Sequence, residues 1–193
     1  MRRTVPVFFA SFAVLILFTS GVRAQNGSGF QEVYTGTIVS MNGPMRSTTF
    51  NLSIRSFTDD AEAQRLLGIL GEGNQDDLLR AIRNNDLGRI STAGSVGRNL
   101  IVARRNELPD GRIQIVAAFE RWQTIREIRS GSRIQDYPFG VMEIFLDSGG
   151  RTGSGTFVAA GRVRLRQRDG KSQLELENFG TYPNRVMGVS RRN

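Results

Sequence analysis

The stretch RVRLRQRDGKSQLELEN, residues 162–178, holds two alternating segments around a short turn. Asp169-Gly170 is a dipeptide typical of two-residue β-hairpin turns. With this pair at the tip, the numbers of facing residues sum to 339, so Arg164 faces Glu175. Facing residues in an antiparallel pair lie side by side on one surface. The stretch therefore predicts a hairpin whose arginines and glutamates form cross-strand ion pairs.

The same register places Arg162 opposite Glu177, and it brings the leucines at 165 and 174 together on the other surface. A slip of one residue would turn both leucines outward, whereas each exposed ion pair contributes only about 0.2–1 kcal/mol. The charges are therefore expected to matter more for register than for stability. The arginines left unpaired by this count, which could form a small anion-attracting patch, are Arg166, Arg168, Arg191 and Arg192.

Alternation extends to other parts of the chain. In TTFNLSIRSF, residues 48–57, Phe50, Leu52 and Ile54 share one face while polar residues occupy the other, which is typical of a half-buried strand. GRISTAGSVGRN, residues 88–99, is interpreted as a loop. It resembles a phosphate-binding glycine loop only superficially, because it lacks the Gly-Lys-Ser/Thr ending and no helix pattern follows it. Further strand signals are EVYTGTIVS (32–40), NLIVARR (99–105), RIQIVAAFE (112–120), FGVMEIFLD (139–147) and GTFVAA (155–160).

Between the second and third strand signals the period changes to that of a helix. Leucines and alanines recur at helical spacing after Thr58, the expected N-cap of a first helix. Asn74, with Asp77 three residues later, predicts the capping box of a second helix. The acids in both first turns are explained by helix capping without any catalytic role. The region near 59–84 is therefore expected to be a helical hairpin.

Together these signals predict an α+β fold of mostly antiparallel β structure. We expect a sandwich or a curved barrel of about eight strands, with a two-helix insertion after the second strand. Residues 30–193 are expected to form a single domain, after a flexible lead at 25–29. About 169 residues suffice for one core that buries roughly 70% of the unfolded surface.

The first 24 residues have the three-part layout of an export signal. Arg2 and Arg3 precede an uncharged run from Val5 to Phe18, and a small-residue site follows, with Val22 and Ala24 at the positions before the expected cut. As a helix, that run would rise about 21 Å, which is short for a hydrocarbon core of about 30 Å. We therefore predict a signal peptide at 1–24, an exported periplasmic or secreted protein, and no stable membrane insertion after cleavage.

Composition excludes several classes of site. The chain has no cysteine and no histidine, which removes thiol nucleophiles, Ser-His-Asp triads and the common zinc ligands. We predict neither a cofactor nor a metal. Loss of three arginines with the leader would lower the formal charge from +8 to +5. We expect no nucleic-acid partner, because the protein is predicted to lie outside the cytoplasm. Of the 26 basic residues only Lys171 is a lysine, and we interpret the arginines mainly as a solvated face.

The candidate binding residues are an aromatic and charged set. Trp122 and Arg126 lie in ERWQTIREIRSG, which could stack on a sugar or a cationic group, although a lone tryptophan more often borders a core. Tyr137 could line a pocket mouth or cap a strand. Glu143 would be a buried acid if it shared the core face, but Met142 and its alternating neighbours favour an outward Glu143.

The segments GTIVSMNGP, DYPFGVMEIFLDSGG and LELENFGTYPNRV resemble those of uncharacterised exported bacterial proteins of about 190 residues, with no known activity. The resemblance covers most of residues 30–193. It implies export and a single strand-rich domain with a helical hairpin. It implies no functional residue.

Three functional hypotheses follow, and the first is preferred. The protein is a non-catalytic exported module that binds an unknown envelope or secreted component, a carrier of a small apolar ligand inside a β-barrel, or a carboxylate-based hydrolase that uses two of Glu120, Glu127 and Glu143. An enclosed apolar cavity would favour the carrier, and two converging acids would favour the hydrolase. A filled interior with neither feature would leave the binding module.

Overall fold

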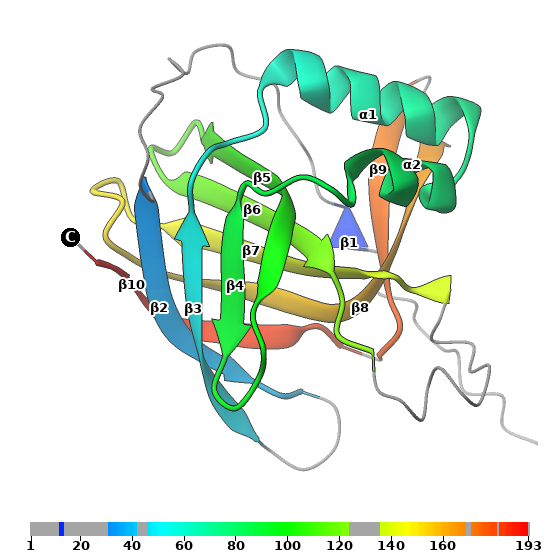
Figure 1. The fold of residues 1–193 in the computed structure, drawn as a ribbon. Helices are drawn as coiled ribbons and strands as arrows, with labels where there is room; N and C mark the ends of the chain where they lie inside the picture. Colours follow the sequence, from blue (N-terminus) through cyan, green and yellow to red (C-terminus); the bar gives the residue numbers. More distant parts are fainter. Residues whose placement is uncertain are drawn as a thin grey trace, which may run out of the picture.

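A computed structural model describes residues 12–13, 31–41, 46–123, 136–168, 171–180 and 182–192. Within these ranges the chain forms ten strands and two helices (Figure 1). The strands are β1 (Phe12–Ala13), β2 (Glu32–Val39), β3 (Ser47–Ile54), β4 (Gly88–Thr92), β5 (Arg98–Glu107), β6 (Ile113–Glu120), β7 (Phe139–Leu146), β8 (Thr152–Arg168), β9 (Lys171–Asn178) and β10 (Asn184–Arg192). The helices are α1 (Asp60–Glu72) and α2 (Gln75–Ile82).

Eight of the strands close into an antiparallel barrel. The sheet runs β8-β10-β2-β3-β4-β5-β6-β7, and β7 pairs with β8 to complete the ring. Closure brings the backbones of β7 and β8 together at Gly155, where a Cβ atom would lie only 1.9 Å from the carbonyl oxygen of Glu143. The mostly antiparallel α+β prediction is confirmed, and of its two alternatives the structure has the curved barrel.

Side chains fill the inside of the barrel. Each strand alternates, so every second residue points inward. Phe119 is fully buried, and its ring lies against Gly140. A Cβ atom at position 140 would lie only 2.3 Å from the Phe119 ring, so the ring needs a glycine there. The expected core faces are confirmed for β3 and β7: the residues that they place in this core include Phe50, Leu52, Ile54, Met142, Ile144 and Leu146.

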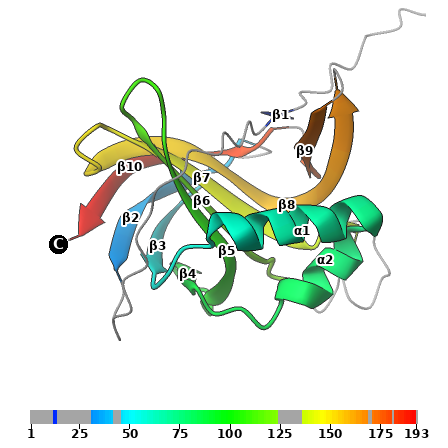
Figure 2. The ribbon, with the colours of Figure 1, turned by 90° about the horizontal axis from the view of Figure 1, so that it is seen from above.

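The last part of β8 leaves the barrel and continues as a separate hairpin with β9. We call this hairpin, residues 161–168 and 171–178, the arm. Its register runs from Gly161 opposite Asn178 to Arg168 opposite Lys171, which confirms the predicted sum of 339 at every pair. Figure 2 shows the arm rising from the barrel on the side that carries the helices.

The helical hairpin packs between the outside of the barrel and the arm. Its apolar residues join a second core, which includes Leu66, Leu70, Ile82 and, from the barrel, Ile101 and Phe139. Val163, Leu165 and Leu174 of the arm pack against this cluster. The apolar face predicted for residues 162–178 is therefore the face that meets the helices.

Two local expectations need correction. The N-cap of α1 is Asp59, whose Oδ1 accepts from the Glu62 amide at 2.7 Å, while Thr58 is buried and its hydroxyl accepts from the Ala103 amide at 3.2 Å. Residues 88–92, expected in a loop, form β4, because Ile90 is needed as an inward residue of the barrel. The capping box of α2 at Asn74 and Asp77 is confirmed.

Candidate functional site

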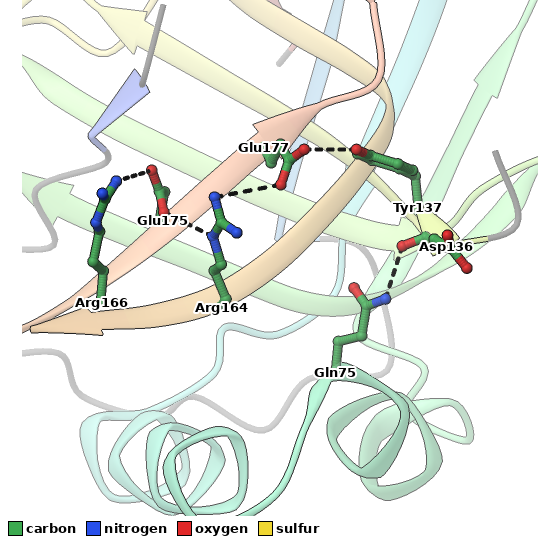
Figure 3. A network of polar contacts seen from close by, with 7 residues as sticks. All are labelled: Gln75, Asp136, Tyr137, Arg164, Arg166, Glu175 and Glu177. Carbon is green, nitrogen blue, oxygen red and sulfur yellow. Dashed lines mark hydrogen bonds and ion pairs between the residues drawn. The ribbon is translucent and has the colours of Figure 1, made fainter. Parts of the chain in front are cut away.

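The charged face of the arm carries a network of ion pairs (Figure 3). Arg164 Nε donates to Glu175 Oε2 at 2.8 Å, and Arg166 Nη1 reaches Glu175 Oε1 at 3.2 Å. The hydrogen bond from Arg164 is the main cause that holds the pKa of Glu175 below its usual value. Glu175 therefore stays ionised between two guanidinium groups. Arg166, which the register predicted from the sequence left without a partner, therefore pairs with Glu175.

Tyr137 connects this face to the segment before β7. Its hydroxyl donates to Glu177 Oε1 at 2.6 Å, and its ring meets the Phe179 ring edge-on with centroids 5.2 Å apart. Glu177 also lies 3.5 Å from Arg164 Nη2. Arg162 faces Glu177 in the ladder, as predicted, but it has no ion-pair partner among the described residues. The predicted Arg162–Glu177 ion pair is wrong because Tyr137 and Arg164 occupy the carboxylate.

Gln75, the first residue of α2, lies across from this network. Its Nε2 donates to the backbone oxygen of Asp136 at 2.7 Å, so the amide group is oriented by the residue next to Tyr137. Its Oε1 is buried and has no hydrogen-bond partner in the described structure. A buried acceptor without a partner costs free energy, typically about 1–3 kcal/mol. Gln75 therefore holds an oriented, unused acceptor.

An open cleft of about 430 Å³ separates the helical hairpin from the arm. One wall comes from the end of α1 and the start of α2, and the other comes from β8 where it leaves the barrel. The cleft combines apolar and polar surface, because it lies where the second core reaches the solvent. We call it the helix–arm cleft; its lining residues are Leu70, Gly71, Gly73, Asn74, Gln75, Asp76, Arg162, Val163, Arg164 and Leu165.

The structure does not bring together the three predicted site residues that it describes, Trp122, Tyr137 and Glu143. Trp122 packs edge-on against Phe119 at 5.0 Å between centroids, and its Nε1 donates to the Val96 carbonyl at 2.7 Å. It borders the main core and holds the loop before β5. Arg126 lies outside the described residues. Only Tyr137 belongs to the network beside the helix–arm cleft.

Glu143 points outward from the barrel, as favoured, but it is nevertheless buried, with 5% of its surface exposed. Its Oε1 accepts from Gln114 Nε2 at 2.6 Å, and Gln114 Oε1 in turn accepts from Asn106. Within the part of the chain that the structure describes, no hydrogen bond of normal geometry reaches Oε2, although Thr156 lies close enough to favour the ionised form slightly. Burial is the dominant cause and raises the pKa of Glu143 above its usual value.

Of the three acids in the hydrolase hypothesis, the structure describes Glu120 and Glu143, and these two lie far apart. Glu143 pairs with Val116 and Glu120 pairs with Phe139, so the two acids are separated by four positions along the β6–β7 ladder. Four positions correspond to about 13 Å along a strand. Paired carboxylates in glycoside hydrolysis lie about 5–9.5 Å apart. Glu127, the third acid, lies outside the described residues.

Arg191, suggested as part of an anion-attracting patch, sits near the end of the barrel. Its Nη2 lies 3.4 Å from Glu32 Oε1, which also accepts from Arg105 Nη1 at 2.5 Å. Tyr34 donates to the second oxygen of Glu32 at 2.5 Å, and burial together with this bond raises the tyrosine pKa. Arg191 and Arg166 thus bind different carboxylates, so the structure does not join them in one patch.

A second open groove, of about 510 Å³, lies on the outer face of β2, β3 and β4. Small neutral residues form a row in register across four strands: Ser190, Thr35, Asn51 and Ser91. Thr35 and Ser190 hydroxyls are 3.2 Å apart. Threonine and serine are common on the wet face of a sheet, so this row is explained by solvation.

The helix–arm cleft was missed by sequence reasoning. Gln75 follows an N-cap, where a polar residue carries no special signal, and Asp136 contributes only its backbone oxygen. Gly71 and Gly73 also line the cleft, but glycines between two helical patterns are typical of a simple break and carry no binding signal in the sequence.

Comparison with known proteins found no matching family model, no similar curated sequence and no similar solved structure. Among the described residues, no helix is long and apolar enough to cross a membrane, and no three acidic side chains gather as a metal site would require. The site is therefore interpreted from its geometry alone.

Proposed function

We propose that the protein is an exported, non-catalytic module that binds its partner or ligand in the helix–arm cleft. The observation that carries this proposal is Gln75, whose amide is oriented by Asp136 while its buried Oε1 has no partner. Because this oxygen has almost no exposed surface, the Gln75 side chain must turn toward the cleft before an N–H or O–H donor of a ligand can reach it and recover the free energy lost by burying it. The predicted ligand class is therefore a hydrogen-bond donor, such as an amide or a hydroxyl compound.

The walls of the cleft are suited to a preformed site. The arm is an extension of a barrel strand, and its charged face is braced by Glu175 and Glu177. The opposite wall is fixed by the capping box at Asn74. Binding to a preorganised surface avoids much of the entropy cost of ordering it. This rigidity supports a binding role for the cleft.

The barrel interior favours a binding module over a carrier. Its core consists of packed, buried side chains such as Phe119, Ile115 and Met142, which occupy the space that an enclosed ligand would need. The separation of Glu120 from Glu143 likewise means that this pair gives no support to a hydrolase. The helix–arm cleft is left as the better-supported site.

Native mass spectrometry of the protein purified from its host's exported fraction tests this proposal. We expect the wild type and Gln64→Leu, a change on the exposed side of α1, to retain the same additional mass. Gln75→Leu should lose it, because leucine has no acceptor for the donor. An additional mass retained equally by Gln75→Leu, or no additional mass in the wild type, would contradict the proposal.

A further inference from the structure

The arm gives the sheet a free edge that the barrel lacks. In the barrel every strand has a neighbouring strand on each side. β9 is different: β8 lies on one side, and the other side lies outside the ring. Among the described residues, the arm has two outer edges, that of β9 and that of β8 beyond Gly161, and only the β9 edge is met by a further strand.

That edge is occupied by a segment from the start of the chain. β1 pairs antiparallel with β9, with Phe12 opposite Leu176 and Ala13 opposite Glu175. It covers two of the eight positions of β9. Phe12 and Ala13 belong to the leader that we expect to be removed on export, so the processed protein would expose the whole edge.

The edge is prepared for strand addition in two respects. Charged side chains normally keep foreign strands away from an edge. Here Glu175 is neutralised by Arg164 and Arg166, and Glu177 is held by Tyr137 and Arg164. The apolar face of β9, with Leu174 packed on the helical cluster, fixes the strand from behind. An added strand would therefore meet a rigid edge with little net repulsion.

We propose that the outer edge of β9 is a strand-acceptor site for an extended apolar segment of a partner protein, and that the leader occupies it before processing. Main-chain hydrogen bonds provide the affinity in strand addition, and alternate side chains provide the specificity. The partner segment places an apolar residue opposite Leu176, as Phe12 does, and a small residue opposite Glu175, as Ala13 does. This site lies across β9 from the helix–arm cleft, which β8 lines.

A synthetic peptide with residues 10–16 of this chain, ASFAVLI, flanked by lysines for solubility, is the probe. The barrel and both cores lie within residues 32–192, so the processed chain, residues 25–193, keeps them. We expect the peptide to bind this chain and to slow hydrogen exchange at Leu174–Asn178. The full chain, whose own leader occupies the edge, should bind the peptide at least about tenfold more weakly.

Two N-methylated peptides separate strand pairing from simple hydrophobic contact. In an antiparallel ladder the amides of neighbouring residues point to opposite sides. Methylation of one of the two amides, Phe12 or Ala13, should therefore abolish binding, while methylation of the other should leave it within about twofold. Equal effects of both changes, or peptide binding without protection of β9, would overturn the proposal.

Further outcomes keep this proposal separate from the proposed function. Gln75→Leu should leave peptide binding unchanged, because Gln75 lines only the cleft. Protection of β9 in the processed chain alone, rising with protein concentration as a dimer forms, would overturn the proposal, because the occupant would then be a second copy. Loss of peptide binding in the processed chain would overturn it as well, while leaving the cleft untouched.

Discussion

Tyr137 and Glu177 lie 40 residues apart in the chain and are joined by a hydrogen bond of 2.6 Å, from the phenol to Oε1. This bond ties the segment before β7 to the arm. Tyr137→Phe removes the donor and keeps the ring contact with Phe179. We expect the free energy of unfolding to fall by about 1 kcal/mol, the usual net contribution of one hydrogen bond. Urea unfolding measures it, and an unchanged midpoint would contradict the bracing role.

The charged face of the arm depends on Glu175. Glu175→Arg removes the carboxylate that pairs with Arg164 and Arg166 and places a third guanidinium group beside them. We therefore expect the free energy of unfolding to fall by about 1–2 kcal/mol. The control is Glu107→Arg at an exposed position of β5, which should change stability by less than about 0.5 kcal/mol. Equal thermal unfolding temperatures for the two variants would show that these pairs do not support the register.

The pH dependence of the Glu175 contribution has a definite sign. Arg164 lowers the pKa of Glu175 in the folded state, so its stabilising effect is present above the unfolded pKa and is lost as pH falls. The difference in stability between the wild type and Glu175→Gln should therefore shrink as the solution is acidified below about pH 4. Chemical denaturation at a series of pH values measures the difference, and a constant gap would count against the ion pair.

Glu143 should show the opposite dependence. Its burial raises the pKa in the folded state, so the folded chain holds this proton more tightly than the unfolded chain. Its contribution is fully present below the unfolded pKa and declines as pH rises through the folded pKa. Glu143→Gln keeps an acceptor for Gln114 without the charge, so we expect its stability relative to the wild type to increase from about pH 4 to pH 8. A pH-independent difference would contradict this assignment.

The wall of the cleft formed by α2 depends on its cap. Asn74 Oδ1 accepts from the amides of Asp76 and Asp77, and the Asn74 amide donates to Asp77 Oδ2. Asn74→Ala should cost about 1 kcal/mol and speed hydrogen exchange in the first turn of α2. Asn84→Ala, at an exposed position after the helix, is the matched control. If both variants exchange alike, the cap does not hold this wall.

Sequence patterns predicted the fold best where a constraint acts locally. Placing Asp169-Gly170 at the tip predicts every described pair of the arm, and Asn74 with Asp77 sets the start of α2. The choice between sandwich and barrel depends on β7 meeting β8, an approach that requires Gly155 and has no local signature. The predicted pair of Arg162 with Glu177 failed for a similar reason, because Tyr137 competes from a distant segment.

The candidate site was less predictable than the fold. Residue type alone indicated Trp122 and Glu143 as candidates. In the structure Trp122 packs at the border of the main core, and Glu143 is a buried acid on the outer face of the barrel. The cleft instead depends on an ordinary glutamine that a backbone oxygen orients. Only the packing of the helical hairpin against the arm brings these groups together, and that packing is a property of the tertiary structure.

The central claim, that Gln75 presents an unused acceptor in a binding cleft, is tested most directly by nuclear magnetic resonance of the ¹⁵N-labelled processed chain. Titration with N-methylacetamide, which offers one N–H donor, should saturate and shift the side-chain amide of Gln75 together with the amides of Gly71, Gly73 and Val163. Acetate, which offers no donor at neutral pH, should not. Equal shifts with both compounds, or no saturable shift at Gln75, would contradict the account.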